Sequence, residues 1–267
     1  MNKGKLTVLI RSLGMMMFAD FVKFNVYRLI NFRKNRAFRA RHPGIKLPPD
    51  YMVFESFKLD YEKYYDGGME SAAWVVSVFS KYTSVDGKRV LDWGCGPARI
   101  TRHLSGLMQK AEIVGTDYNL DTVEWCRQNI PNALFHTNTI NSQLPFPDDR
   151  FDLIIGISIF THLSEINHQF WIKELYRVIG KGGIILLTTA GAAFKSQMTD
   201  SEAVDFESNR LVVRSNVMEG HRTYAAFQPV VYFRDLCSPY FDILECKEGV
   251  PKSWGIEQDY WILKAKK

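Results

Sequence analysis

The chain has 267 residues and a formal net charge of +5, with 46% hydrophobic, 24% charged and 13% aromatic residues. This length suffices for one large α/β domain, or for one domain with an appendage, whereas two full domains would be crowded. The composition excludes collagen-like, low-complexity and wholly disordered chains. We therefore expect a folded globular protein.

Positive charge is concentrated at the start of the chain. Residues 1–49 carry eleven Lys and Arg and one acid, Asp20, a net of +10, whereas the remaining residues carry a net of −5. Apolar side chains recur every three or four positions over residues 6–40, which predicts a helix that ends before His42. We expect residues 1–49 to form a basic, amphipathic helical extension and residues 50–267 to form the main domain.

Two roles of this extension stay open. A basic amphipathic helix in residues 1–47 can make peripheral contact with an anionic membrane, with apolar side chains in the interface and Lys and Arg at lipid phosphates. Alternatively, the helix packs on the main domain and keeps a solvated basic side. Its longest uncharged stretch, residues 12–19, is too short to cross a bilayer. Nucleic acid is disfavoured as a partner, because the aromatic residues of 51–65 follow no RNA-binding signature.

The four cysteines are widely spaced and form no C-x-x-C pair; they are Cys95, Cys126, Cys237 and Cys246. This spacing indicates neither a zinc site nor a disulfide scaffold. We therefore expect no metal centre and a reducing, cytoplasmic location.

From Lys88 onward, short apolar runs alternate with helical patterns, which is typical of βαβ units around a mostly parallel sheet. The expected strands are 88–92, 111–116, 133–136, 151–157, 183–189, 241–246 and 259–265. The expected helices are 69–82, 98–109, 119–129 and 165–179. A glycine-rich turn at residues 180–183 should end the last of these helices. The predicted fold class is α/β, with a Rossmann-like, doubly wound, mostly parallel seven-stranded sheet.

Residues 190–232 follow neither a strand pattern nor a helix pattern. A segment of this length between two sheet strands is typically a functional cover. We expect this insertion to select the substrate, and it contains a candidate general base, His221.

A glycine pair marks a candidate cofactor site. Gly94 and Gly96 follow a strand end, where they allow a tight turn and close approach of a ligand to the backbone. Roughly twenty residues later Asp117 ends the next strand, where a carboxylate can accept hydrogen bonds from ribose hydroxyls. Together these features indicate a cofactor that contains adenosine. The alternative is that the glycines only make a strand-to-helix turn.

The neighbouring residues favour one cofactor over another. A dinucleotide fingerprint would need glycine where this chain has Arg99, which disfavours a nicotinamide dehydrogenase. Asp92, directly before the glycine turn, suits an ammonium group better than a pyrophosphate. S-adenosylmethionine offers an adenosine, a positive sulfonium and an amino-acid end, so we expect this cofactor.

Residues 88–189 resemble the core of the class I S-adenosylmethionine-dependent methyltransferases. The resemblance rests on residues 92–96, Asp117, residues 144–154 and residues 177–183, in that order along the chain. It implies the class I fold, methyl transfer and the product S-adenosylhomocysteine. Residues 158–163 and 258–261 resemble bacterial members associated with glycan and cell-surface biosynthesis.

The resemblance also implies roles for individual residues. Gly94 and Gly96, with Cys95 between them, would line the methionine part of the cofactor, and Asp92 would hold its amino group. Asp117 would accept the ribose hydroxyls, with Tyr118 against the adenine and Asn138 at the adenine edge. Phe160 and His162 would face the methyl group and the acceptor. A third glycine that family members commonly have is replaced by Ala98. Tyr64 and Tyr65 are candidates for cofactor or substrate contact, or else fill the core.

These features predict a function. The sulfonium methyl is already activated, so the enzyme has to align the acceptor atom, exclude water and, for a hydroxyl acceptor, remove a proton. His162 or His221 could be that base. The leading hypothesis is O-methylation of a sugar, surface-glycan or lipid-linked precursor at the inner membrane face. The alternatives are methylation of a small metabolite or lipid, and a noncatalytic S-adenosylmethionine-binding or RNA-associated module.

Overall fold

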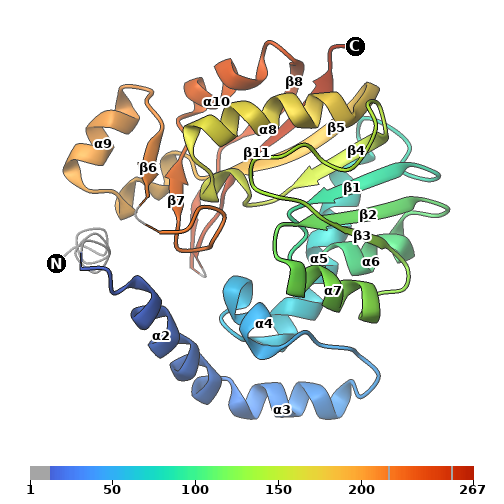
Figure 1. Cartoon of the computed structure of the whole chain (residues 1–267), viewed down its shortest axis with the longest axis vertical. Helices are drawn as coiled ribbons and strands as arrows, with labels where there is room; N and C mark the ends of the chain where they lie inside the picture. The colour runs from blue at the N-terminus through green and yellow to red at the C-terminus, as the bar shows by residue number, and fades with distance from the viewer. Residues whose placement is uncertain (1–12, 216, 254) are drawn as a thin grey trace. The chain divides into compact units, whose positions relative to one another are not determined.

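The computed structural model describes residues 13–215, 217–253 and 255–267 (Figure 1). Its main sheet has seven strands in the order β3-β2-β1-β4-β5-β11-β8. The strands are β1 (Arg89–Trp93), β2 (Glu112–Asp117), β3 (Leu134–Thr137), β4 (Phe151–Gly156), β5 (Ile179–Thr189), β8 (Phe241–Lys247) and β11 (Asp259–Ala265). β1, β2 and β3 pair in parallel, as do β4 and β5, whereas β11 is antiparallel to both β5 and β8. The predicted mostly parallel, seven-stranded α/β sheet is confirmed.

The central strands are buried along almost their whole length, as expected for parallel strands covered on both faces. The helices that follow the strands are α6 (Thr101–Leu107), α7 (Leu120–Asn129), α8 (Glu165–Val178) and α10 (Val230–Cys237). Polar N-caps start two of them: Asn119 accepts the Thr122 amide before α7, and Ser164 accepts the Asn167 amide before α8.

Several expected element boundaries differ in the structure. The helix expected over 69–82 is α5 (Tyr61–Phe79), which already begins at Tyr61. α6 begins three residues later than the expected position 98, because the backbone before it makes a left-handed turn. The predicted turn at residues 180–183 is wrong: β5 begins at Ile179, directly after α8. Phe151 pairs with Ile179 and Leu153 with Ile184, so the glycines form an irregular start of the strand instead of a helix cap.

The chain forms two compact units. The N-terminal unit is Met17–Thr137 and contains β1 to β3, and the C-terminal unit is Asn138–Lys267 together with the described part of Met1–Met16. Among the described residues, no helix combines the length and the apolar character that crossing a membrane requires.

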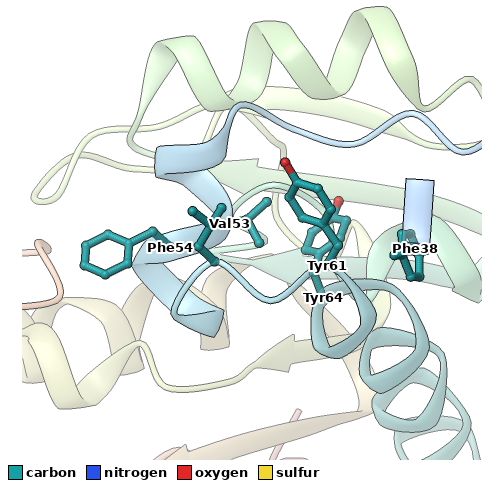
Figure 2. Packing of buried hydrophobic residues seen from close by; sticks show 6 residues of the cluster. Phe38, Val53, Phe54, Tyr61 and Tyr64 are labelled. Atoms are coloured by element: carbon teal, nitrogen blue, oxygen red, sulfur yellow. The ribbon is translucent and has the colours of Figure 1, made fainter. Parts of the chain in front are cut away.

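Four helices begin the N-terminal unit: α2 (Met16–Ile30), α3 (Phe32–Arg41), α4 (Asp50–Phe57) and α5 (Tyr61–Phe79). The predicted helix over residues 6–40 is confirmed from Met16 onward, with a break at Asn31. Residues 13–15 are not helical, and residues 6–12 lie outside the described residues. α3, α4 and α5 contribute Phe38, Val53, Phe54, Tyr61 and Tyr64 to one buried cluster (Figure 2). Packing on the unit's own core, the second interpretation of the extension, is therefore present in this structure.

A buried asparagine locks these helices together. The Asn35 side chain donates to the Leu59 carbonyl at 2.8 Å and accepts the Tyr61 amide at 3.1 Å. Both backbone groups lie at the turn between α4 and α5, where no helical partner is available to them. α3 is thereby fixed against that turn.

The 190–232 insertion has secondary structure of its own, although its sequence follows neither a strand nor a helix pattern. It contains the 3₁₀ turn η2 (Ala192–Gln197), helix α9 (Asp200–Glu207) and a two-stranded sheet of β6 (Val212–Arg214) and β7 (Ala225–Phe227). Thr199 and Glu202 form a capping box at the start of α9, and Glu202 also accepts two hydrogen bonds from Arg214. Elements this short leave no periodic pattern in the sequence.

Replacing Tyr64 with phenylalanine tests the connection between α5 and the segment after β1. The Tyr64 hydroxyl donates to the Pro97 carbonyl at 2.6 Å and accepts from Arg102 at 2.9 Å. Losing both bonds inside the protein should lower the free energy of unfolding by about 1–3 kcal/mol in urea titrations. Tyr65→Phe is the matched control, because the Tyr65 hydroxyl bonds to none of the described residues, and it should change stability by less than about 0.5 kcal/mol. Equal losses in both variants would contradict the proposed link.

Candidate cofactor and acceptor sites

The loop after β1 is tied by hydrogen bonds to the end of β2. The Gly94 and Cys95 amides both donate to the Thr116 carbonyl, at 2.8 and 2.9 Å. The backbone is left-handed at Gly94, Gly96 and Ala98, with φ of 73°, 51° and 55°. Ala98 therefore occupies a conformation that favours glycine, at the position where the family commonly has one. The expected tight glycine turn is present at the carboxyl end of β1.

Asp117 is the central acceptor of this site. It is 8% exposed at the end of β2, and its two carboxylate oxygens accept the Gly96 and Asn119 amides, each at 2.9 Å. Burial raises the pKa of Asp117, and these backbone hydrogen bonds oppose the shift. Each carboxylate oxygen has a second lone pair, so the group can also accept hydroxyl donors. The geometry fits the ribose of an adenosine cofactor.

Asp92 lies at the end of β1, where the Thr101 hydroxyl donates to its carboxylate at 2.6 Å. Burial raises the pKa of Asp92 to about 6, against the lowering effects of the Thr101 hydrogen bond and the Arg99 charge. A buried carboxylate in this position gains from a cationic ligand group. This carboxylate, as a hydrogen-bond acceptor, therefore fits the ammonium group of S-adenosylmethionine.

Arg99 clamps the loop to the helices that precede the sheet. Its guanidinium donates to the Ser71 hydroxyl on α5 and lies 4.8 Å from the Phe57 ring centre on α4. At Gly68 a Cβ atom would collide with the Arg99 carbonyl oxygen, so only glycine lets α5 approach this closely. Arg99, which disfavours a dinucleotide cofactor in the sequence, thus has a structural role in this unit.

One acid near the site was missed by the sequence analysis. Glu55 on α4 has a pKa raised to about 7 by burial and by the charge of Asp117. Burial also raises the pKa of Tyr118 to about 12, with Asp117, Glu55 and Tyr51 adding to the shift. Glu55, Asp117 and Tyr118 are therefore close enough to interact electrostatically. The sequence feature that could have pointed to Glu55 is its position as an acid among the aromatic residues of 51–65.

The remaining expected cofactor residues of this unit support the loop from inside. Tyr64 is fully buried, and Tyr65 packs its ring edge-on to His103, 4.9 Å between centres. The Cys95 thiol is buried, which raises its pKa, and it donates to the Gly96 carbonyl at 3.4 Å. In this structure the two tyrosines and the thiol act as packing and positioning groups.

The C-terminal unit brings the two candidate bases together. The Gly220 amide donates to the His162 carbonyl at 2.9 Å, which joins the loop of His221 to the 3₁₀ turn η1 (Phe160–His162). His162 Nδ1 lies 2.8 Å from the Tyr224 carbonyl. Because a carbonyl can only accept, Nδ1 carries the proton, and Nε2 of the neutral ring is the basic nitrogen. Burial lowers the pKa of His162, and the hydrogen bond to the Tyr224 carbonyl opposes the shift, so the ring is neutral at pH 7.

His221 is 6% exposed, and burial lowers its pKa. Its Nδ1 accepts the Thr223 amide at 3.3 Å, which assigns the proton to Nε2 in the neutral ring. The two histidines therefore present different nitrogens as bases. His162 has its basic nitrogen on the side away from Tyr224, whereas that of His221 is engaged by Thr223.

The expectations for Phe160 and Asn138 both stay predictions. Phe160 is 0% exposed, with its ring 5.0 Å from the His168 ring and 5.1 Å from the Phe233 ring. In this structure the Phe160 ring packs in the core of the C-terminal unit. Asn138 donates to the neighbouring Thr139 carbonyl at 2.8 Å, and its Oδ1 accepts from none of the described residues.

Hydrogen bonds hold the side chain of Gln258, a residue of the 258–261 motif for which the sequence predicted no role. Its Oε1 accepts the hydroxyls of Ser158, at 2.8 Å, and Thr188, at 2.6 Å. The Ser158 amide donates to the Thr188 hydroxyl, which directs the Thr188 proton to Gln258. The amide NH₂ of Gln258 donates to none of the described residues. This places a fixed donor at the carboxyl ends of β4 and β5, where α/β sheets bind ligands.

Comparison with known proteins supports this description. Residues 90–183 match a family described as "Methyltransferase domain". The chain is 27% identical over 180 residues to a malonyl-acyl-carrier-protein O-methyltransferase of Bacillus anthracis, covering 66% of this chain and 64% of that protein. It is 31% identical over 137 residues to a fatty-acid O-methyltransferase of Mycolicibacterium smegmatis, covering 46% of this chain and 49% of that protein. The chain thus spans less than two thirds of the length of either relative.

Solved structures show the same fold. An S-adenosylmethionine-dependent methyltransferase of Methanosarcina mazei has a TM-score of 0.57 at 18% identity, covering 70% of this chain and 96% of that one. Another, of Mesorhizobium loti, has a TM-score of 0.52 at 13% identity, covering 72% of this chain and 97% of that one. The chain therefore has the fold of these methyltransferases, and residues 90–183 match a methyltransferase family whose members imply S-adenosylmethionine as cofactor.

Proposed function

We propose that this protein is an S-adenosylmethionine-dependent methyltransferase that transfers a methyl group to an oxygen of an acyl or other lipid acceptor. The observation that carries the proposal is the pair of buried acids, Asp92 and Asp117, held on either side of a left-handed glycine turn. Asp117 would bind the ribose hydroxyls, Asp92 the amino group and the turn the methionine backbone. When bound, the cofactor supplies a methyl group activated on a sulfonium.

The acceptor class is supported by the relatives and by Gln258. The names of both relatives describe acyl acceptors, one malonyl-acyl-carrier protein and one a fatty acid. A carboxylate or carbonyl oxygen can accept from the fixed NH₂ of Gln258, which the hydroxyls of Ser158 and Thr188 orient. A carboxylate is already anionic at neutral pH, so its methylation requires no base.

A sugar or surface-glycan precursor, lipid-linked or not, is the second candidate acceptor. The observation in its favour is the neutral His162, whose Nε2 can take the proton from a hydroxyl. We also propose a cytoplasmic location, in keeping with four free cysteines at Cys95, Cys126, Cys237 and Cys246.

Asp117→Asn tests the cofactor site. Calorimetric titration with S-adenosylhomocysteine should show an affinity at least about tenfold weaker than wild type, because a charge-assisted hydrogen bond to ribose is lost. Asp121→Asn is the matched control: Asp121 is exposed on α7, and this variant should bind like wild type. Wild-type affinity in Asp117→Asn, or binding of NAD instead, would contradict the assignment.

The pH dependence of binding tests Asp92. Its pKa of about 6 means that the free site holds the carboxylate above pH 6 and the neutral acid below it. A ligand ammonium binds the carboxylate, so affinity should fall as the pH drops below 6, by up to about tenfold per pH unit. Asp92→Asn should remove this slope. The pKa of Glu55, about 7, lies near the same range, so Glu55→Gln is the control. This variant should keep the slope if Asp92 is the group that titrates. A slope that persists in Asp92→Asn would assign the titration to another group.

Gln258→Leu tests the acceptor site. With a fatty acid or a malonyl thioester as acceptor, kcat/KM should fall by about ten- to a hundredfold, because one hydrogen bond to a charged oxygen is lost. In Gln258→Glu, kcat/KM should fall further, because the introduced charge repels an acceptor carboxylate. Both variants should bind S-adenosylhomocysteine normally, and Gln128→Leu, on the exposed surface of α7, is the matched control. If Gln258→Glu kept or raised activity on hydroxyl acceptors alone, the glycan candidate would replace the acyl one.

A further inference from the structure

Helix α2 has an exposed apolar face. Residues 13–32 hold ten of the twenty exposed large hydrophobic side chains among the described residues. Within α2 these are Met17 at 61%, Phe18 at 63%, Phe21 at 62%, Val22 at 45%, Val26 at 46%, Leu29 at 79% and Ile30 at 66% exposed. Scattered apolar residues need no explanation, but a continuous group of this size marks an interaction surface.

The opposite face of α2 fixes the rotation of the helix. Phe24 packs edge-on to the rings of Tyr51 and Phe54, at 5.6 and 5.3 Å, and Tyr27 joins the same cluster. Asp20 is buried and accepts a hydrogen bond from the Tyr51 hydroxyl at 3.2 Å. Residues 20, 24 and 27 recur at helical spacing, so they share one face. Rolling the helix to bury the apolar face would break these contacts.

The same two helices, α2 and α3, also carry exposed basic side chains. Lys34, Arg39 and Arg41 are paired within the unit, with Asp60, Asp50 and Glu62. Lys23, Arg33 and Arg36 are exposed and form no ion pair or hydrogen bond with any residue in the described part of the chain. Three free cations therefore lie on α2 and the first turns of α3, beside the exposed Phe32.

We propose that α2 and the start of α3 dock on an anionic lipid bilayer. The apolar face of α2 enters the interface between headgroups and acyl chains, and Lys23, Arg33 and Arg36 contact headgroup phosphates. α2 has 15 residues, and no described helix can cross the membrane, so it lies in the plane of the surface. Membrane docking through this surface does not depend on the proposed methyl-transfer activity.

Charge distinguishes a bilayer from the other occupants of such a face. Residues 1–49 carry a net of +10, so a second copy of the chain placed on this face would bring two positive segments together. A nucleic acid would neutralise the cations but leave the phenylalanines in water. An anionic bilayer satisfies both the apolar and the basic side chains.

Vesicle co-sedimentation of the full-length protein tests the proposal. The probes are vesicles of phosphatidylcholine alone, and of phosphatidylcholine and phosphatidylglycerol at about three to one. Wild type should bind the anionic vesicles, and the double variant Phe18→Glu/Phe21→Glu should bind at least about tenfold more weakly. Arg33→Gln/Arg36→Gln should bind the anionic vesicles about tenfold or more weakly, since each basic residue contributes roughly a fivefold factor. Val204→Glu/Met218→Glu, which replaces two apolar side chains exposed elsewhere at 60% and 65%, should bind like wild type.

Three results would overturn the proposal. The first is wild-type binding no stronger than that of Phe18→Glu/Phe21→Glu on anionic vesicles. The second is a dimer in sedimentation velocity that this double variant abolishes, which would assign the face to a second copy. The third is RNA binding that depends on Arg33 and Arg36 but not on the phenylalanines. Thermal unfolding and S-adenosylhomocysteine affinity, measured on every variant, should stay at wild-type values and show that the fold and the cofactor site are intact.

Discussion

The carboxylate of Asp117 is the contact on which the cofactor site depends. By accepting the Gly96 and Asn119 amides it joins the turn after β1, the end of β2 and the start of α7. A buried carboxylate is costly unless it is hydrogen-bonded, and backbone amides at a left-handed turn supply those bonds without ordering additional side chains. The same hydrogen bonds hold the turn and the carboxylate together, so the support of the turn and the position of Asp117 arise from one arrangement.

Around this centre the N-terminal helices act as a supporting layer. Arg99 and Tyr64 connect α5 and α4 to the glycine turn, and Gly68 allows the close approach. The aromatic cluster of α3, α4 and α5 holds this layer, and α2 packs one face on it while the other face stays exposed. The extension that looked like an appendage in the sequence is therefore part of the unit that contains the proposed cofactor residues, and it carries a second surface.

The proposed acceptor chemistry rests on groups in the C-terminal unit that are held by hydrogen bonds. Gln258 is oriented by two hydroxyls and His162 by a carbonyl, so the protonation and direction of each are determined by their partners. A fixed amide donor suits an acyl oxygen, and a neutral imidazole suits a hydroxyl. Which of the two groups matters depends on whether the acceptor oxygen already carries a negative charge.

The sequence by itself determined the elements with strong local signals: the seven strands, the glycine turn and Asp117, because strand periodicity and turn chemistry are encoded within a few residues. It did not reveal the short elements of residues 190–232 or the burial of Phe160, which depend on packing. Only the tertiary structure brought Glu55 near Asp117 and Gln258 to Ser158, a hundred positions away in the chain. It also decided which face of α2 is exposed. The physical reason is that local patterns determine what a segment becomes, whereas chain folding determines which distant side chains meet.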